Sequence, residues 1–304
     1  MKSIVYFNGK FLPYEEACIP LATHALHYGT GCFEGIRGYW SVEKKKLSVF
    51  KLRQHYERLQ KSCTRLLMKL PNNIDELCQI TIEVLKRNNY SEDVYIRPLI
   101  YKSSEIITAF NLRKLDDGFA IYTTPLGRYL NASKGIKAIT SSWQRVSEKM
   151  IPPWAKPTGL YLNTALAKTE AEDKGFDEAI LLNTDGSVSE GSAENIFLVR
   201  GRKLITPSST QNILLGITRA TIIELAKKEF NIETEERKID KKELFEADEM
   251  FVTGTGAEVT PLTQINGHKI NGGNIGRVTK DLQTYYFSIV RAKNNKYSHW
   301  LTKV

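Results

Sequence analysis

The chain has 304 residues, of which 41% are hydrophobic and 25% are charged, and its formal net charge is +9. These proportions are those of an ordinary globular protein, and no apolar run approaches the roughly 18 residues of a membrane helix. The length favours about two domains. Basic residues mostly alternate with acidic ones, which favours a solvated surface or anionic small molecules. A nucleic-acid-binding protein remains an alternative, although no binding motif supports it.

The four cysteines all lie in the first eighty residues, at Cys18, Cys32, Cys63 and Cys78. No two of them form a CxxC pair, so we expect free thiols in a reducing cytoplasm. The N-terminal stretch has only a short apolar patch and no small-residue cleavage site, and we do not expect a signal peptide. A zinc site is the alternative, with Cys18, His24, His27 and Cys32 as ligands, but this spacing matches no usual pattern and no metal is expected.

The first half of the chain predicts a mixed domain of helices and strands. Asn8-Gly9, between IVYF and KFL, predicts a β-hairpin. Helices are expected over 52–68 and 74–88, because apolar residues recur there at helical spacing. The apolar face of the first helix consists of Leu52, Tyr56, Leu59, Cys63 and Leu66. Strands are expected at 32–39, 47–50, 94–101 and 119–124.

TPLGRYLNASKG is rich in turn residues and predicts a linker. The chain therefore divides into a small N-terminal domain (1–124), an interdomain loop (125–134) and a large C-terminal domain (135–304). In the last of these, a helix from about Leu160 to Lys174 should end at Gly175. Further helices are expected from Ile217 and over 277–291, with strands elsewhere. The fold class is α/β or α+β.

Three features of the second half suit an anionic ligand. Gly216-Ile217-Thr218 opens a helix, where free N–H groups bind phosphate well. Gly254-Thr255-Gly256 is a glycine turn at a strand end, which can present successive N–H groups. Ser189-Glu190-Gly191 lies in the predicted strand VSEGSAENIFLV, at a sheet edge. Ordinary capping and turn chemistry accounts for each pattern taken alone.

Lys156 stands in MIPPWAKPTGLYLNT, beside Trp154, three prolines and a predicted helix start. Most lysines are solvated surface charges, but this setting is unusual for one. A second unusual stretch is HALHYGTGCFEGIRGY (24–39), where four glycines alternate with aromatic and charged residues. Its composition suggests either a lined pocket or a glycine-rich turn that leads into a strand.

Taken together, these segments resemble a known family. HALHYGTGCFEGIRGY, YIRPL, WAKPTGLYLN, DGSVSEGSAENIF, GITRATI and ADEMFVTGTGAEVTP occur in this order. They resemble the branched-chain amino-acid aminotransferases, which are class IV (fold-type-IV) pyridoxal-phosphate enzymes. The resemblance runs from Tyr6 to the last helix. It implies a small N-terminal α/β domain, a larger C-terminal pseudo-barrel domain, and a homodimer in which a neighbouring subunit lines part of the pocket.

The resemblance also implies which residues bind the cofactor, pyridoxal 5'-phosphate. Lys156 matches the lysine that binds it covalently and then moves the proton between the substrate Cα and the cofactor. Glu190 matches the partner of the pyridine nitrogen, and Tyr161 a tyrosine beside the phenolic oxygen. The phosphate is expected on Arg58, Ile217, Thr218 and Thr255. The helical pattern alone places Arg58 on the polar side of its helix, as a surface charge.

The substrate residues follow from the same resemblance. Tyr28, Phe33 and Gly35 match the pocket wall, with Gly35 leaving room. Backbone N–H groups of the turn at Thr255, Gly256 and Ala257 match those that take the α-carboxylate. Tyr28, Arg97 and Tyr129 match the polar set for the distal carboxylate of glutamate. The implied reaction is a ping-pong transfer of the amino group from leucine, isoleucine or valine to 2-oxoglutarate.

The match has departures beside the substrate. The loop after YIRPLIYKS reads SEIITAFNLRKLDDG instead of a glycine-rich segment, Leu126 replaces a large aromatic residue, and Pro157-Thr158 follow Lys156. These departures concern the range of amino donors. The alternative within the class is a D-amino-acid or (R)-amine transaminase, or a lyase of the aminodeoxychorismate type.

Overall fold

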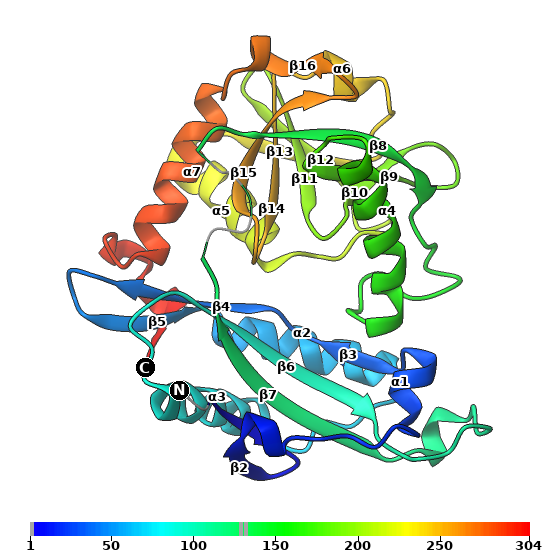
Figure 1. Cartoon of the computed structure of the whole chain (residues 1–304). Helices are drawn as coiled ribbons and strands as arrows, with labels where there is room; N and C mark the ends of the chain where they lie inside the picture. Colours follow the sequence, from blue (N-terminus) through cyan, green and yellow to red (C-terminus); the bar gives the residue numbers. More distant parts are fainter. Residues whose placement is uncertain (1–2, 128–129, 131–132) are drawn as a thin grey trace. The chain divides into compact units, whose positions relative to one another are not determined.

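The computed structural model describes residues 3–127, 130 and 133–304. These residues form two compact units (Figure 1). Unit 1 comprises 1–127, 155–159 and 288–304, and unit 2 comprises 128–154 and 160–287. The predicted division assigns everything after residue 134 to one domain, whereas the structure assigns 155–159 and 288–304 to unit 1. The predicted loop at 125–134 includes residues 128–129 and 131–132, which lie outside the described residues.

The described part of unit 1 contains an eight-stranded sheet in the order β17-β5-β4-β6-β7-β1-β2, with β3 paired to β6. Its neighbouring strands are antiparallel. Asn8 and Gly9 have positive φ and close the predicted hairpin. The strands are β1 (Ile4–Phe7), β2 (Lys10–Pro13), β3 (Gly31–Phe33), β4 (Ile36–Ser41), β5 (Lys46–Phe50), β6 (Val94–Lys102), β7 (Asp117–Pro125) and β17 (Leu301–Lys303).

Two helices, α2 (Leu52–Arg65) and α3 (Ile74–Asn88), pack on one face of this sheet. Four residues of the predicted apolar face of α2 lie in the core with Val94, Ile96 and Ile100 of β6, while the fifth, Leu66, lies just past the helix end and is only partly buried against that core. α2 ends three residues before the predicted end, because Leu67 has a φ of 57°. Strand alternation turns the residues between these β6 positions, among them Arg97, to the opposite face.

A short helix that the sequence did not predict, α1 (His24–Tyr28), precedes β3. It ends at Gly29 in the left-handed conformation, where glycine is favoured. The chain returns to this point much later. Gly159 N–H and the Thr158 hydroxyl donate to Gly29 O at 3.1 and 2.8 Å, and Phe33 N–H donates to Lys156 O at 3.1 Å. The segment 155–159 is therefore bound along the chain from Gly29 to Phe33.

The described part of unit 2 contains a nine-stranded sheet in the order β10-β9-β8-β15-β14-β11-β12-β13, with β16 paired to β15. β8 is parallel to both of its neighbours. The core is a cluster of buried aliphatic side chains from these strands. The strands are β8 (Ile136–Gln144), β9 (Glu178–Leu182), β10 (Val188–Gly191), β11 (Asn195–Arg200), β12 (Lys203–Pro207), β13 (Glu233–Arg237), β14 (Glu249–Gly254), β15 (Glu258–Ile265) and β16 (His268–Lys269).

The helices that begin in unit 2 are α4 (Tyr161–Asp173), α5 (Ile217–Phe230), α6 (Glu243–Glu246) and α7 (Arg277–Val290). Gly175, with a φ of 76°, follows the end of α4 as predicted. The prediction of one strand through VSEGSAENIFLV is wrong. Gly191 N–H donates to Glu194 O at 2.6 Å, and this turn separates β10 from β11.

Along the described chain, we find no helix with the length and apolarity required to cross a membrane.

The approach of the two segments at Gly29 can be tested by substitution. A Cβ on Gly29 would lie 2.7 Å from Gly159 Cα, and φ is 62°. Gly29→Ala should therefore lose more stability than the about 1–2 kcal/mol of a left-handed residue. Gly9→Ala is the matched control, because Gly9 also has positive φ but nothing lies within 4 Å of its Cβ position. Equal losses of stability in urea unfolding would contradict a close approach.

Candidate active site

Lys156 lies against Phe33 in unit 1. Its ammonium group is 5.2 Å from the centre of the Phe33 ring, and the Arg97 guanidinium is 4.2 Å from the same ring. Phe33 is 5% exposed. The structure thus brings together three of the predicted site residues: a lysine amine, an apolar ring and a guanidinium.

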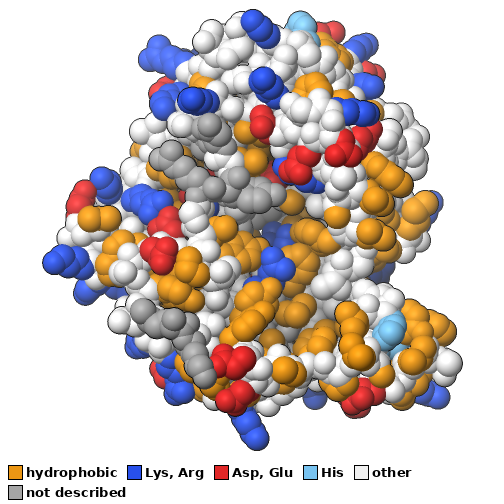
Figure 2. Space-filling model, in the orientation of Figure 1, with side chains coloured by type: hydrophobic (Ala, Val, Ile, Leu, Met, Phe, Trp, Pro, Cys, Tyr) orange, Lys and Arg blue, Asp and Glu red, His pale blue; other side chains and the backbone are white. Residues whose placement is uncertain are grey.

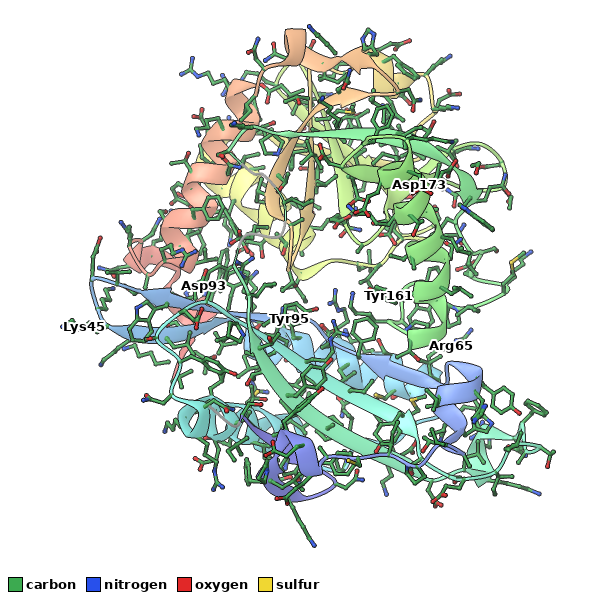
Figure 3. The ribbon with its side chains drawn as sticks, in the orientation of Figure 1. Lys45, Arg65, Asp93, Tyr95, Tyr161 and Asp173 are labelled. Atoms are coloured by element: carbon green, nitrogen blue, oxygen red, sulfur yellow. The ribbon has the colours of Figure 1, made fainter. Side chains whose placement is uncertain are left out.

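Arg97 and Gly35 share a neighbour, Tyr95 (labelled in Figure 3). Arg97 Nη2 donates to the Tyr95 hydroxyl at 3.0 Å. A Cβ on Gly35 would lie 2.0 Å from that hydroxyl, so the space beside Gly35 is filled by Tyr95. The Nε of Arg97 is buried and has no hydrogen-bond partner within the described part of the chain. Burial of an unpaired donor is costly, which suits a position that binds an acceptor.

Arg58 is not the surface charge that the helical pattern indicates, because its side chain is only 13% exposed. Its Nε and Nη2 donate to the two oxygens of Glu34 at 2.7 and 2.8 Å. His55 Nδ1 lies 2.8 Å from Glu34 Oε2. Neither Glu34 nor His55 was predicted as a site residue. Two signals existed: Glu34 belongs to FEGIR, and His55 stands one helical turn before Arg58.

Burial alone would raise the pKa of the Glu34 carboxyl, but Arg58 and His55 bring that pKa below its ordinary value. Burial lowers the pKa of the His55 imidazole more than the Glu34 carboxylate raises it. The cluster is therefore an Arg58–Glu34 ion pair completed by a neutral histidine, which donates its Nδ1 proton to the carboxylate.

Tyr28 contacts neighbours other than the predicted site residues. Its ring packs on His24 and Phe110, at centroid distances of 4.6 and 5.1 Å, and its hydroxyl donates to Ile107 O. Tyr129 lies outside the described residues.

The zinc alternative finds no support, since both ring nitrogens of His24 contact oxygens. Within the described ranges, no group of three or more His, Cys, Asp or Glu residues could hold a metal ion.

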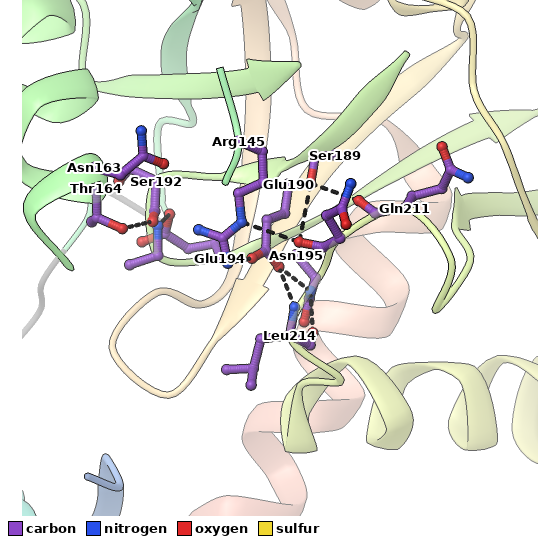
Figure 4. A network of polar contacts seen from close by, with 12 residues as sticks. Arg145, Asn163, Thr164, Ser189, Glu190, Ser192, Glu194, Asn195, Gln211 and Leu214 are labelled. Carbon is purple, nitrogen blue, oxygen red and sulfur yellow. Dashed lines mark hydrogen bonds and ion pairs between the residues drawn. The ribbon is translucent and has the colours of Figure 1, made fainter. Parts of the chain in front are cut away.

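Glu190 is the centre of a buried polar network in unit 2 (Figure 4). Arg145 Nη2 lies 2.5 Å from its Oε1, while Asn195 Nδ2 and Leu214 N–H donate to its Oε2 at 2.8 and 3.1 Å. Glu190 is 4% exposed and stands on β10, at one end of the sheet order. Arg145, which was not predicted, balances the charge of this carboxylate.

The start of α5 has a glycine as its N-cap. This residue, Gly216, has no side chain to occupy the first N–H groups of the helix. A Cβ at Gly216 would lie 2.2 Å from Asn195 Oδ1, so no larger residue fits there. Thr218, in the first turn, is 3% exposed. The phosphate cradle at Gly216, Ile217 and Thr218 stays a prediction.

Thr255, Gly256 and Ala257 form the turn between β14 and β15. Just before it, the Thr253 hydroxyl is buried and has no hydrogen-bond partner among the residues described. Tyr161 is the first residue of α4 (Figure 3). The residues of unit 2 therefore supply a carboxylate, a helix N-terminus, a hydroxyl-bearing turn and a tyrosine. This donor set fits a phosphorylated pyridine.

With this geometry in view, comparisons with known proteins identify the family. Residues 31–265 match the model of class IV amino-transferases. The chain is 49% identical to a probable branched-chain-amino-acid aminotransferase of Aquifex aeolicus, over 98% of this chain and 96% of that protein. The chain belongs to the branched-chain amino-acid aminotransferases of class IV. It is an enzyme of that family, and its cofactor is pyridoxal phosphate.

Solved structures agree with this family and with its fold. A branched-chain aminotransferase from Thermoproteus uzoniensis, crystallised with norvaline, has a TM-score of 0.95 and 41% identity, covering 100% of this chain and 99% of that one. The Thermobaculum terrenum enzyme in its PLP-bound holo-form has a TM-score of 0.93 and 37% identity, covering 99% of this chain and 98% of that one. The predicted fold-type-IV architecture is thereby confirmed.

Two further buried acids, Glu178 and Glu194, belong to unit 2 together with the Glu190 network. Lys168 Nζ is 3.1 Å from Glu178 Oε2, and Ala193 N–H donates to Glu194 Oε2 at 3.0 Å. Burial, followed by the charge of Glu178, raises the pKa of Glu194 well above its ordinary value. Because the pKa is higher in the folded state, proton binding by Glu194 stabilises the fold at acid pH. This stabilisation is lost as the pH rises towards the folded pKa.

Glu194→Gln mimics the protonated acid, so this variant should not lose stability at this position as the pH rises. The melting temperature of the variant, relative to that of the parent protein, should therefore increase as the pH rises from about 4.5 to 8. Glu170→Gln is the control. Burial raises the pKa of Glu170, but Lys174, Ser141 and Ser142 lower it to about 2, so its contribution to stability is lost only below about pH 4.5, and the relative melting temperature of this variant should stay constant between about pH 4.5 and 8. Parallel melting curves for Glu194→Gln and the parent at every pH would contradict the assignment.

Proposed function

We propose that this enzyme reversibly transfers the amino group of L-leucine, L-isoleucine or L-valine to 2-oxoglutarate, giving a branched-chain 2-oxo acid and L-glutamate in two half-reactions. The observation that carries the proposal is the contact of Phe33 with both Lys156 and Arg97. An apolar wall beside the reactive amine suits a branched alkyl group, and a guanidinium with a buried unpaired Nε suits a carboxylate. One pocket can then accept both substrates.

The cofactor residues are proposed as follows. The phosphate is held by Arg58, by Ile217 and Thr218 at the start of α5, and by Thr255. Glu190 accepts the hydrogen bond of the protonated pyridine nitrogen, and Tyr161 donates to the phenolic oxygen. Bound pyridoxal phosphate supplies the carbonyl that takes the amino group and a ring that withdraws electrons from the substrate Cα. Charge-assisted hydrogen bonds of this kind contribute roughly 1.5–3 kcal/mol each.

The protein residues handle the proton and the charge. Lys156, once its amine is displaced by the substrate, would take the proton from the substrate Cα as a base and deliver it as an acid to C4′ of the cofactor. Arg145 pairs with Glu190 at 2.5 Å and two N–H groups donate to it, and these contacts favour the charged form of its carboxyl. The N–H groups of Gly256 and Ala257 take the substrate α-carboxylate, and Gly35 and Phe33 belong to the pocket wall. Arg97 is proposed to receive the distal carboxylate of glutamate, with Tyr28 and Tyr129.

We also propose a homodimer formed through the surface around α1. Figure 2 shows hydrophobic side chains gathered there, and the exposed ones are Leu21, Leu26, Ile106, Ile107 and Phe110. Exposed apolar patches of this kind mark association surfaces. A second copy of the chain on this surface would take Tyr28 into the pocket of its neighbour.

The cytoplasm is the proposed location, in keeping with the four free cysteines.

The visible absorption spectrum of the purified protein tests the function. L-leucine should convert the band of the lysine-bound cofactor to the pyridoxamine form, and 2-oxoglutarate should restore it. D-alanine, added to a separate sample, should leave the band unchanged. A band that responds only to D-alanine would instead indicate a D-amino-acid transaminase with the same cofactor.

Arg97→Gln tests the carboxylate site. The KM for glutamate should rise roughly 10- to 100-fold, the equivalent of one lost charge-assisted bond, while the KM for leucine changes little. Arg87→Gln is the matched control, since Arg87 belongs to the same unit but pairs with the exposed Glu83 on α3. Equal increases of KM for glutamate and leucine in Arg97→Gln would remove Arg97 from the carboxylate site.

A further inference from the structure

Glu34 holds a position that no role in the proposed reaction explains. It is completely buried, and its backbone N–H donates to Pro98 O of β6 at 2.9 Å. Its backbone, between the end of β3 and the start of β4, is therefore tied to β6, and its carboxylate is shielded from solvent. A buried carboxylate is costly unless strong partners compensate it, and Arg58 and His55 are those partners.

The contact with Arg58 fixes the direction of the guanidinium. Glu34 binds the edge formed by Nε and Nη2, with two nearly equal distances. Because the guanidinium is planar and rigid, a bidentate partner on one edge determines the plane and the direction of the opposite edge. An anion that binds Arg58 must then meet the Nη1 side. Without such a partner, the long side chain would have to lose rotamer freedom when it binds.

His55 fixes Glu34 in turn. Its Nδ1 proton binds Oε2, the same oxygen that Arg58 Nη2 contacts. The Glu34 carboxylate therefore has donors on both oxygens, with the guanidinium on Oε1 and Oε2 and the imidazole on Oε2. The charges of Glu34, Arg58 and Lys156 act on the His55 imidazole.

The residue before Glu34 holds the other predicted cofactor ligand of unit 1. Phe33 N–H donates to the backbone oxygen of Lys156, and Cys32 and Pro157 form an isolated bridge. Two consecutive residues, Phe33 and Glu34, are thus connected to Lys156 and to Arg58.

We propose that Glu34 is a positioning residue, which orients the Arg58 guanidinium so that its opposite edge binds the phosphate of the cofactor. This inference rests on the proposed role of Arg58. It predicts that Glu34 acts on phosphate recognition and not on the binding of the pyridine ring.

The test compares two ligands of the apoenzyme, pyridoxal phosphate and pyridoxal, which lacks the phosphate. The ratio of their dissociation constants, measured by fluorescence titration, reports phosphate recognition alone. Glu34→Gln offers Arg58 only one acceptor and should reduce the preference for pyridoxal phosphate about tenfold or more, with pyridoxal affinity unchanged. Glu34→Asp keeps the charge but is one methylene shorter, so it should reduce the preference less, and it serves if Glu34→Gln does not fold.

Asp93→Asn is the matched control, because Asp93 (labelled in Figure 3) makes a bidentate pair with Arg291 in the same unit, at 2.6 and 2.7 Å. It should keep the full preference. Arg58→Met tests the role of Arg58 separately from that of Glu34, and it should lose the preference for pyridoxal phosphate. If Arg58→Met loses it but both Glu34 variants keep it, the role of Glu34 is refuted and that of Arg58 stands. If Arg58→Met also keeps it, the proposed phosphate site is wrong.

An equal loss of affinity for pyridoxal and pyridoxal phosphate in the Glu34 variants would also refute the proposal, since Glu34 would then support only the fold.

Discussion

The proposed chemistry of unit 1 depends on one stretch of backbone, from Gly29 to Glu34. Its first residues bind the segment 155–159 through backbone bonds and the Thr158 hydroxyl, and Phe33 N–H holds the carbonyl of Lys156. Its last residue, Glu34, places a carboxylate in the core, where only paired charges are stable. A lysine more than 120 residues away in the chain and an arginine on α2 thereby take their positions from six consecutive residues. Arg97 approaches the same Phe33 ring from β6, the central strand of the sheet.

Unit 2 follows the same rule for buried charge. Glu190 is balanced by Arg145, and Glu178 by Lys168, both at short distance. For Glu194, burial and the charge of the neighbouring Glu178 raise the pKa more than Lys168 lowers it, so this carboxyl binds a proton more readily. The turn Gly191–Glu194 brings these acids together, since it ends β10 just after Glu190 and starts β11 at Asn195. Asn195 then bonds to both Glu190 and the carbonyl of Leu214, shortly before α5. Glu190, proposed as the partner of the pyridine nitrogen, is therefore linked by one hydrogen-bonded network to Leu214, three residues before α5 begins.

Local signals predicted the local structure well. Asn8-Gly9 fixes a hairpin because both residues accept positive φ, and the spacing on α2 fixes its buried face whatever surrounds it. The family resemblance was confirmed because it rests on several motifs in one order. Long-range partners were not predictable in this way. Arg58 has the helical position of a surface residue, and only the buried Glu34 on another element reverses that interpretation. Arg145, 45 residues before Glu190, gave no sequence signal at all. The break inside VSEGSAENIFLV was missed because both halves have strand composition, and a single hydrogen bond at Gly191 separates them.

The central claim is that Lys156 is the residue to which the cofactor is attached, and it can be tested directly by chemical trapping. Borohydride reduction of the holoenzyme makes the bond between the cofactor and its lysine permanent, and mass spectrometry of the digested protein then locates the phosphopyridoxyl group. The account predicts this group on the peptide that contains Lys156, in about one copy per chain. Its presence on any other lysine, with the Lys156 peptide unmodified, would contradict the assignment of the site and the positioning of Lys156 by Phe33.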